Sequence, residues 1–252
     1  YARVPEPIYY PDTDGEPMAE SDFQADPLTY LRSALKDYFQ TQTDVYVSGN
    51  LLIYYQEGHS ELSVAPDVFV TFDVPNYQRD SYKVWEEGKA PDVVIEITSR
   101  TTQKKDEEVK PGLYRQLGIQ EYFQYDPKGE YLKPALKGRR LIGHRRYQAL
   151  TPIYGLDGSL RFTSRVLGGL ELRLERGNLR LFDPQTGNYL FTYSEAVAAY
   201  RLERQQKELA LQQAAQERQQ KELALQQKEL LANQLRALGV KPEEILKNWH
   251  SH

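Results

Sequence analysis

The sequence predicts an α/β fold, in which a mixed central sheet is flanked by helices and followed by extra β hairpins and a long C-terminal helix. Three observations predict it. Residues 26–125 read in the order helix, three strands, helix, strand. Short apolar runs separated by glycine turns follow from 131 to 191. Neither Gly nor Pro occurs from 194 to 238. We therefore expect a globular domain over 1–195, a helix over 196–238 and a tail over 239–252.

Composition limits the classes of protein that need consideration. The 252 residues carry a net charge of −4, with 27% charged residues and no cysteine. Such a chain can form one core with an appendage. The absence of cysteine excludes disulfides and thiolate chemistry. This suits a reducing cytoplasm, which is the location we expect. No apolar run is long enough to cross a membrane, and no signal segment is expected. Mild acidity disfavours bulk binding of nucleic acid but leaves a local basic patch possible.

The first helix is expected from Asp26 to Phe39, after an irregular arm. Asp26 is a favoured N-cap, and Pro27 suits the first helical position. Four apolar residues share one helical face: Leu28, Leu31, Leu35 and Phe39. This spacing predicts a helix packed on a core.

Four strands and a second helix follow. The β-branched and aromatic runs that predict the strands are Val45–Tyr55, broken at 48–50, then Asp67–Phe72, Val93–Thr98 and Tyr122–Tyr125. The second helix is expected from Thr101 to Gly118. The hairpins from 131 to 191 are expected to extend the sheet.

Two Pro-Asp dipeptides, at Pro66-Asp67 and Pro91-Asp92, each open an apolar run, and the second run also contains Glu96. A carboxylate inside a Val/Ile strand is costly to bury unless it has a partner. If the two strands are neighbours, Asp67 and Glu96 can converge on one cation. Mg²⁺ prefers such oxygen ligands. Asp92 lies about 13 Å from Glu96 along an extended strand, so we expect it to end a turn or hold a backbone amide.

The second helix carries the lysines that could serve this pair. Asp106, Lys110 and Tyr114 recur every four residues and share one helical face. If that face packs toward the two acids, Lys110 is placed beside them. A solvated, charged helix surface is the alternative interpretation. Glu121, farther along, is expected to be a surface carboxylate.

These residues also carry a resemblance. Asp67 and Glu96-x-Thr98 resemble the restriction-endonuclease-like superfamily, the PD-(D/E)XK nucleases. Residues 54–127 are most similar to one bacterial branch, a family of restriction endonucleases formerly known only as a domain of unknown function. The motifs are Ala65-Pro66-Asp67-Val68, Pro91 to Ser99, Asp106-x3-Lys110-x3-Tyr114, Gly118 to Phe123 and Asp126-Pro127. The resemblance covers about residues 5–195.

The resemblance implies a restriction-endonuclease-like core, in α-β-β-β-α-β order, and a metal-dependent endonuclease acting on DNA. Asp67 and Glu96 would be the ligands of Mg²⁺, with Mn²⁺ as a substitute. The lysine of the superfamily falls at Thr98, which cannot supply its charge, so the implied lysine is Lys110. Pro111 follows it directly, which favours a helix start near Lys110. Two neighbouring lysines remain as replacements: Lys104 and Lys105. Tyr114 is expected to pack against the strand edge or to position water or substrate.

A basic stretch from 131 to 156 contains no Asp or Glu. We consider it a candidate phosphate contact or, equally, a hairpin whose charge is balanced by acids elsewhere. Its candidate nucleic-acid-binding residues are Lys137, Arg139, Arg140, Arg145 and Arg146.

The C-terminal helix contains an internal repeat, since residues 203–216 nearly recur as 217–230. The period of 14 is two heptads. One column holds Leu202, Leu209, Leu223 and Leu230, and the other holds mostly glutamine. This pattern indicates a thin coiled coil, hence a homodimer through 196–238, or else a solvated single helix. Two further functions stay open: a catalytically silent nuclease fold that binds or oligomerises through this helix, and hydrolysis of RNA instead of DNA.

Overall fold

The computed structural model describes residues 8–13, 21–143 and 146–239. The chain divides into two compact units, Tyr1–Tyr193 and Ser194–His252. The expected boundary lay at 195. All strands that the structure describes belong to the first unit.

The first helix, α1 (Asp22–Tyr38), begins one turn before the expected start, with Ser21 at the N-cap. The prediction that Asp26 caps this helix is therefore wrong. Pro27 lies inside α1, where its missing N–H removes one bond near the N-terminus of the helix. Its buried residues are Leu28, Leu31, Ala34 and Leu35. Phe39, also expected on this face, is the C-cap residue after α1 and is buried as well.

A six-stranded mixed sheet forms the centre of the first unit. Its strands in spatial order are β1 (Val45–Ser48), β4 (Val68–Phe72), β6 (Val93–Ile97), β7 (Glu121–Tyr125), β8 (Leu136–Ile142) and β9 (Arg146–Ala149). Among the described strands of this sheet, β6 and β7 form the one parallel pair. A helical crossover connects these two strands, as parallel pairing requires. The predicted mixed α/β core is confirmed.

Two smaller sheets complete the first unit. One contains β3 (Ser63–Val64), β2 (Ile53–Tyr54) and β5 (Tyr82–Lys83), next to the short helix α2 (Val84–Glu87). The other contains β10 (Ile153–Tyr154), β11 (Leu160–Thr163), β12 (Glu171–Glu175), β13 (Asn178–Asp183) and β14 (Asn188–Tyr189). The expectation that all hairpins extend the central sheet was wrong, because only β8 and β9 do so.

The crossover helix contains a wide turn. It begins at residue 103 and runs through a π-helical segment, η1 (Lys105–Val109), into α3 (Lys110–Gln116). The Lys110 N–H bonds to the Lys105 carbonyl, five residues back. The regular α-helix α3 therefore starts at Lys110, as Pro111 had suggested, but a π-helical turn precedes it. The wide turn ends directly before Pro111, so the chain stays helical where a regular α-helix would lose a bond and clash.

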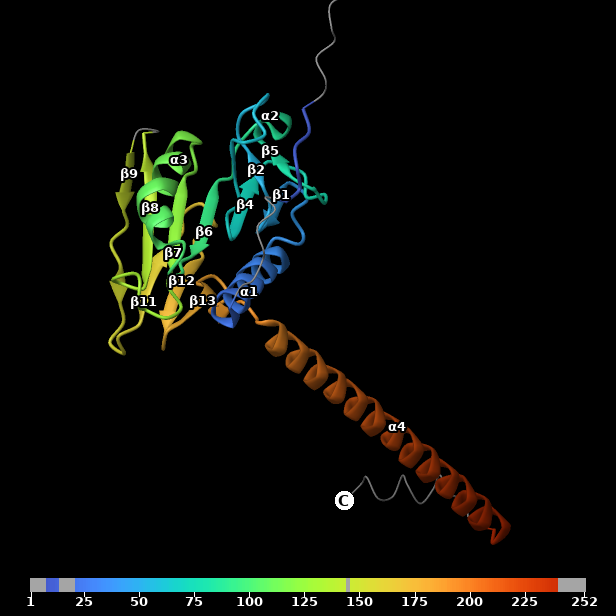
Figure 1. Cartoon of the computed structure of the whole chain (residues 1–252). Coiled ribbons are helices and arrows are strands. Elements are labelled where there is room, and N and C mark those ends of the chain that lie inside the picture. Colours follow the sequence, from blue (N-terminus) through green and yellow to red (C-terminus); the bar gives the residue numbers. More distant parts are fainter. Residues whose placement is uncertain (1–7, 14–20, 144–145, 240–252) are drawn as a thin grey trace, which may run out of the picture. The chain divides into compact units, whose positions relative to one another are not determined.

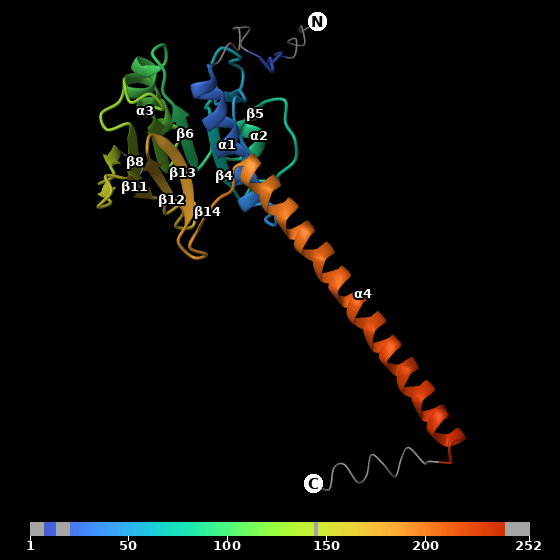
Figure 2. The same cartoon turned by 90° about the horizontal axis from the view of Figure 1, so that it is seen from below.

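Both faces of the central sheet are buried. Successive side chains along each strand point to opposite faces, so alternate residues belong to different hydrophobic clusters. One face packs on α1 and the five-stranded sheet, through residues such as Val47, Val70 and Ile95. The other packs on α3 and the three-stranded sheet, through Phe69, Val94 and Tyr122. Figures 1 and 2 show α3 and strands β11–β13 on opposite faces of the central sheet.

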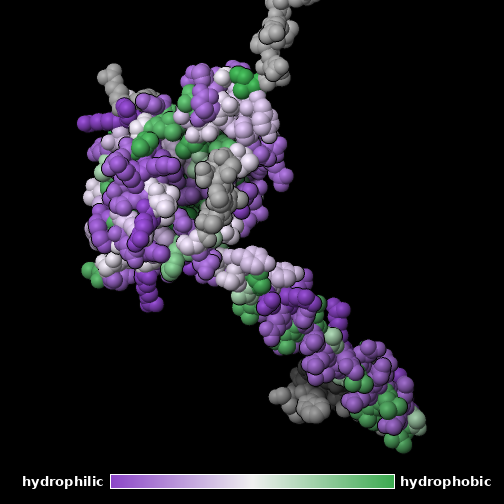
Figure 3. All heavy atoms as spheres, viewed as in Figure 1, coloured by the Kyte–Doolittle hydropathy of each residue, from purple (hydrophilic) through white to green (hydrophobic). Residues whose placement is uncertain are grey.

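The second unit consists, among its described residues, of the helix α4 (Tyr193–Ala237), which starts in the last residue of the first unit. No residue of α4 is buried. Figure 3 shows separate hydrophobic groups along a mostly hydrophilic helix surface. Four leucines of α4 are each more than half exposed: Leu202, Leu209, Leu223 and Leu230. None of the described helices combines the length and apolar character needed to cross a bilayer.

Candidate active site

Four polar side chains lie in one row across the face of the central sheet that packs on α3. The β4–β6 register, continued by one residue, places Asp67 opposite Glu96. Glu96 pairs with Gln124 on β7, and Gln124 pairs with Lys137 on β8. Since register neighbours point to the same side of a sheet, these four side chains share one surface. The row places both predicted acids next to one another.

Asp67 immediately precedes β4 and is half-buried. Its Oδ2 accepts the N–H of Ile97 at 2.6 Å, and its own N–H points to Glu96 Oε2 at 3.4 Å. Burial, and then the charge of Glu96, raise the pKa of the Asp67 carboxyl well above its ordinary range. Gly49 lies against the Asp67 backbone: a Cβ there would come within 2.1 Å of the Asp67 carbonyl oxygen. A glycine at this position therefore lets β1 end directly beside Asp67.

Glu96 is fully buried in β6, yet both of its oxygens have partners. The Tyr114 hydroxyl donates to Oε1. Lys110 Nζ lies 2.9 Å from Oε2. These contacts satisfy a carboxylate that would otherwise be costly inside an apolar strand. They also fix its orientation toward Asp67.

Lys110 is the cation of the cluster, with its side chain 17% exposed. Its Nζ also lies 2.9 Å from Asp106 Oδ1, as an ion pair without the alignment of a hydrogen bond. Burial lowers the pKa of Lys110, but the charges of Glu96, Asp106 and Asp67 raise it by more, so the net shift is upward. Lys110 is therefore protonated at neutral pH. Burial, followed by the Glu96 charge, also raises the pKa of Tyr114 well above normal, so its hydroxyl keeps its proton.

The wide turn holds this cation in place. Asp106 lies in η1, and its backbone carbonyl accepts the Tyr122 hydroxyl at 2.9 Å and Gln124 Nε2 at 3.0 Å. Both donors come from β7, so the turn is tied to the sheet. The other Gln124 side-chain atom, Oε1, is buried without a hydrogen-bond partner among the described residues. Gln124 was missed at the sequence level; an amide within the aromatic strand EYFQY was the available signal.

The other candidates lie apart from this cluster. Lys104 and Lys105 are exposed, and no contact joins them to Glu96 among the described residues. The hydroxyl of Thr98 is buried and has no partner in that part of the chain. Asp92 accepts the Phe72 N–H at 2.8 Å and pairs with Lys89 at 2.8 Å. It holds the opposite end of β6 in place.

The basic stretch does not form one surface. Lys137 pairs with Glu107, and the Arg139 guanidinium lies 5.8 Å from the Tyr122 ring, both on the face that packs on α3. Arg140 points to the other face, where it contacts buried Glu121 at 2.7 Å. Successive residues of β8 alternate between faces, and carboxylates balance the charges of Lys137 and Arg140, which agrees with the second interpretation for these two residues. Arg146 is exposed. Arg145 lies outside the described residues.

Glu121 is a second buried carboxylate, not the surface residue that was expected. Besides Arg140, it accepts the Ser164 hydroxyl and the Arg165 N–H, at 3.1 Å for the latter. These partners belong to the segment next to β11, so their hydrogen bonds to Glu121 tie the central sheet to the five-stranded sheet. We assign Glu121 a role in the fold.

Comparison with protein families places this geometry in context. Residues 5–175 match the family described as "Putative restriction endonuclease", Uma2. The match spans more than half of the 252 residues. The chain belongs to this family. The family region contains the whole Asp67–Glu96–Lys110 cluster and ends with β12, before α4.

Among solved structures, the Uma2 chain is similar to a "putative nuclease belonging to DUF820" from Anabaena variabilis. That match has 15% sequence identity and a TM-score of 0.39, and it covers 53% of this chain and 69% of the other. No curated protein matches this chain. Family membership supports a nuclease role.

Proposed function

We propose that the protein is a metal-dependent endonuclease that hydrolyses phosphodiester bonds of DNA. The observation that carries the proposal is the environment of Glu96: a fully buried carboxylate opposite Asp67, with protonated Lys110 2.9 Å from it. A fully buried Glu96 opposite half-buried Asp67, with one lysine shared between Glu96 and Asp106, is costly as a purely structural device. Such strongly coupled groups are typical of functional sites.

Asp67 and Glu96 are the residues that would hold Mg²⁺, with Mn²⁺ as a substitute. Their chemistry fits this cation, which needs one or two carboxylates and takes water and phosphate oxygens as its other ligands. The raised pKa of Asp67 supports the fit, since burial and then the charge of Glu96 disfavour its ionised form, and a bound cation would offset both. No third carboxylate, histidine or cysteine joins them in a metal-type cluster within the described ranges. When bound, such a metal lowers the pKa of a coordinated water and offsets phosphate charge.

The residues of the chain supply orientation and positive charge. Lys110 would donate a hydrogen bond to a phosphate oxygen as negative charge develops on it. Tyr114 holds Glu96 in position and cannot itself accept a proton from water, because its hydroxyl stays protonated. In the overall reaction, the oxygen of water bonds to phosphorus, the ester P–O bond breaks, and the leaving oxygen takes up a proton.

The decisive experiment is cleavage of supercoiled plasmid by the purified protein with Mg²⁺ or Mn²⁺, and with EDTA as a blank. We expect the wild-type protein to nick the plasmid. Glu96→Gln and Asp67→Asn should each reduce the rate of nicking by at least about a hundredfold, equivalent to about 2.7 kcal/mol of transition-state stabilisation. Lys110→Ala should reduce it similarly. Exposed Glu108→Gln, in the same helical segment, is the matched control and should retain nicking.

Each departure from this pattern has a defined meaning. Nicking lost in Glu96→Gln but kept in Lys110→Ala would transfer the cationic role to Lys104 or Lys105. Nicking unaffected by Glu96→Gln would come from a contaminant. Activity on RNA but not DNA would change the substrate. An inactive wild-type protein that is correctly folded would favour the silent, oligomerising alternative.

We also propose that two copies pair through α4, which would bring two sites to one duplex. The supporting observation is the column of exposed leucines at seven-residue spacing on a helix with no buried residue. An isolated solvated helix of this composition gains nothing from such a column, whereas a coiled coil buries it.

A further inference from the structure

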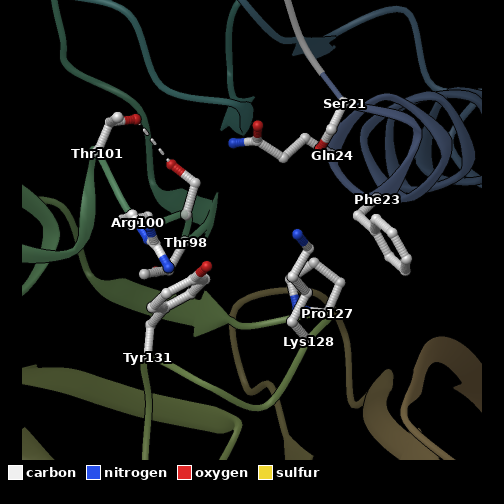
Figure 4. A pocket seen from close by; sticks show the side chains of 10 residues that line it. Ser21, Phe23, Gln24, Thr98, Arg100, Thr101, Pro127, Lys128 and Tyr131 are labelled. Atoms are coloured by element: carbon white, nitrogen blue, oxygen red, sulfur yellow. Dashed lines mark hydrogen bonds between the residues drawn. The ribbon is translucent and has the colours of Figure 1, made fainter.

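A cavity of about 280 Å³ lies beyond the C-terminal end of β6, on the first unit. Three segments line it: the start of α1, the residues directly after β6, and the turn after β7. In Figure 4, the side chains of Arg100 and Tyr131 lie next to one another and face Lys128 across the hollow. Ligand sites are usually concave, with a small number of polar groups placed to orient the ligand.

The cavity is positively charged. Arg100 and Lys128 both line it, and neither forms an ion pair with an acid in the part of the chain that the structure describes. None of the described lining residues is acidic. Elsewhere in this unit, basic side chains such as Lys110, Lys137 and Arg140 pair with carboxylates. Two unpaired cations around one hollow indicate an anionic ligand.

Aromatic rings accompany these cations. Phe23 and Tyr131 line the cavity, and the Phe23 ring is 56% exposed and lies 4.9 Å from Lys128 Nζ. The cavity volume of about 280 Å³ is far larger than the roughly 10–15 Å³ that a single water needs. Cations combined with exposed aromatic faces are the arrangement that binds single-stranded nucleic acid, through phosphate contacts and base stacking.

The cavity adjoins the candidate active site along the chain. Thr98, which lines it, follows Glu96 by two residues, and its N–H continues the strand ladder to the Tyr125 carbonyl at 2.7 Å. Two extended residues span about 7 Å. A strand whose phosphate lies at Glu96 can therefore place a neighbouring nucleotide in the cavity.

We propose that this cavity binds one unstacked nucleotide of the substrate strand. Its phosphate contacts Arg100 and Lys128, and its base or sugar lies on Tyr131 and Phe23. The proposal rests on the proposed nuclease function, and it specifies the substrate: a strand with an unpaired nucleotide beside the cleaved bond, since a base within a duplex has no exposed face to stack on.

The test separates binding from cleavage. A fluorescent single-stranded oligothymidylate is titrated with full-length protein in EDTA, and fluorescence anisotropy is measured. We expect Arg100→Gln/Lys128→Gln and, separately, Tyr131→Leu to raise Kd about tenfold or more, the size of losing one stacked base and its phosphate contacts. The control Lys36→Gln/Arg165→Gln removes two exposed charges outside the cavity and should raise Kd less than about threefold. Melting temperatures verify that each variant is folded.

A blunt duplex of the same length should bind at least about tenfold more weakly than the single strand, with no difference between wild type and Tyr131→Leu. Failure of wild type to bind the single strand, or equal losses in the cavity and control variants, would overturn the proposal. Plasmid nicking is measured in parallel. Cavity-dependent binding without any nicking would reject hydrolysis and keep the cavity site. Nicking by the wild type, with unchanged binding in the cavity variants, would support hydrolysis and reject the cavity site.

Discussion

Gly49 determines how closely β1 can approach the candidate metal ligand Asp67. Because an added Cβ would lie 2.1 Å from the Asp67 carbonyl oxygen, Gly49→Ala must displace backbone on one side or the other. We expect a loss of about 1–3 kcal/mol in the free energy of unfolding, as for other overpacked sites, and a weaker nuclease. Chemical denaturation and plasmid nicking measure the two effects. Gly112→Ala, where an added Cβ meets nothing within 4 Å, is the control and should not destabilise the protein.

Tyr114 satisfies a buried charge. Tyr114→Phe removes the hydrogen bond to Glu96 Oε1 while keeping the ring, so the carboxylate loses one of its partners. We expect the free energy of unfolding to fall by about 1–3 kcal/mol. Urea denaturation would show this, with Tyr154→Phe, at an exposed ring, as the control. Equal stability of the two variants would mean that water replaces the tyrosine hydroxyl.

The ion pair of Glu87 should contribute to the loss of folding stability at acid pH. It pairs with Arg79 at 2.6 Å, and this pairing holds the pKa of Glu87 below its ordinary value despite burial. Since the folded-state pKa lies below the unfolded value of about 4.3, the pair stabilises the fold above that pH. The contribution is lost as pH falls through the folded-state pKa. Melting temperature measured from pH 6 downward should therefore fall less steeply in Glu87→Gln than in wild type.

Among elements, the crossover between β6 and β7 shows best what sequence reasoning can and cannot reach. The four-residue spacing of Asp106, Lys110 and Tyr114 predicted a shared face, and the structure places all three around the Glu96 region. The π-helical turn was beyond reach, because it depends on two donors from β7 that hold the Asp106 carbonyl. Such tertiary contacts leave no local pattern.

Register explains most of the remaining differences. Alternation along β8 could be read from the sequence, but the identity of the partners across the sheet could not. Arg140 was therefore a candidate phosphate contact and Glu121 was expected at the surface, although they form one ion pair in which Glu121 is buried. The expectation that all hairpins extend the central sheet was wrong for the same reason. Which sheet a hairpin joins depends on which strand edges are already occupied.

The helix α4 offers a prediction at this scale. Leu209→Gln/Leu223→Gln removes two members of the leucine column and should lower self-association, because a coiled coil depends on that column. Leu211→Gln/Leu225→Gln changes equally exposed leucines about 200° away around the helix and should have less effect. Light scattering after size-exclusion chromatography gives the mass of each variant. Identical masses for all three proteins would exclude pairing through this column.

At the scale of the whole molecule, we expect the first unit to stay folded without the second. The hydrophobic clusters belong entirely to the first unit, and α4 buries none of its residues. Removal of residues 201–252 should therefore leave a cooperative thermal transition within a few degrees of that of the full chain. Circular dichroism at increasing temperature measures it. Loss of cooperativity would show that the long helix is needed for folding.

The 14-residue repeat of α4 gives this helix an adjustable length. In a helix supercoiled at 3.5 residues per turn, 14 residues complete four turns, so adding or deleting one repeat returns the leucine column to the same side. Each repeat changes the length by about 21 Å. Adding or deleting whole repeats can thus change the length of α4 in fixed steps while the leucine column keeps the same interface.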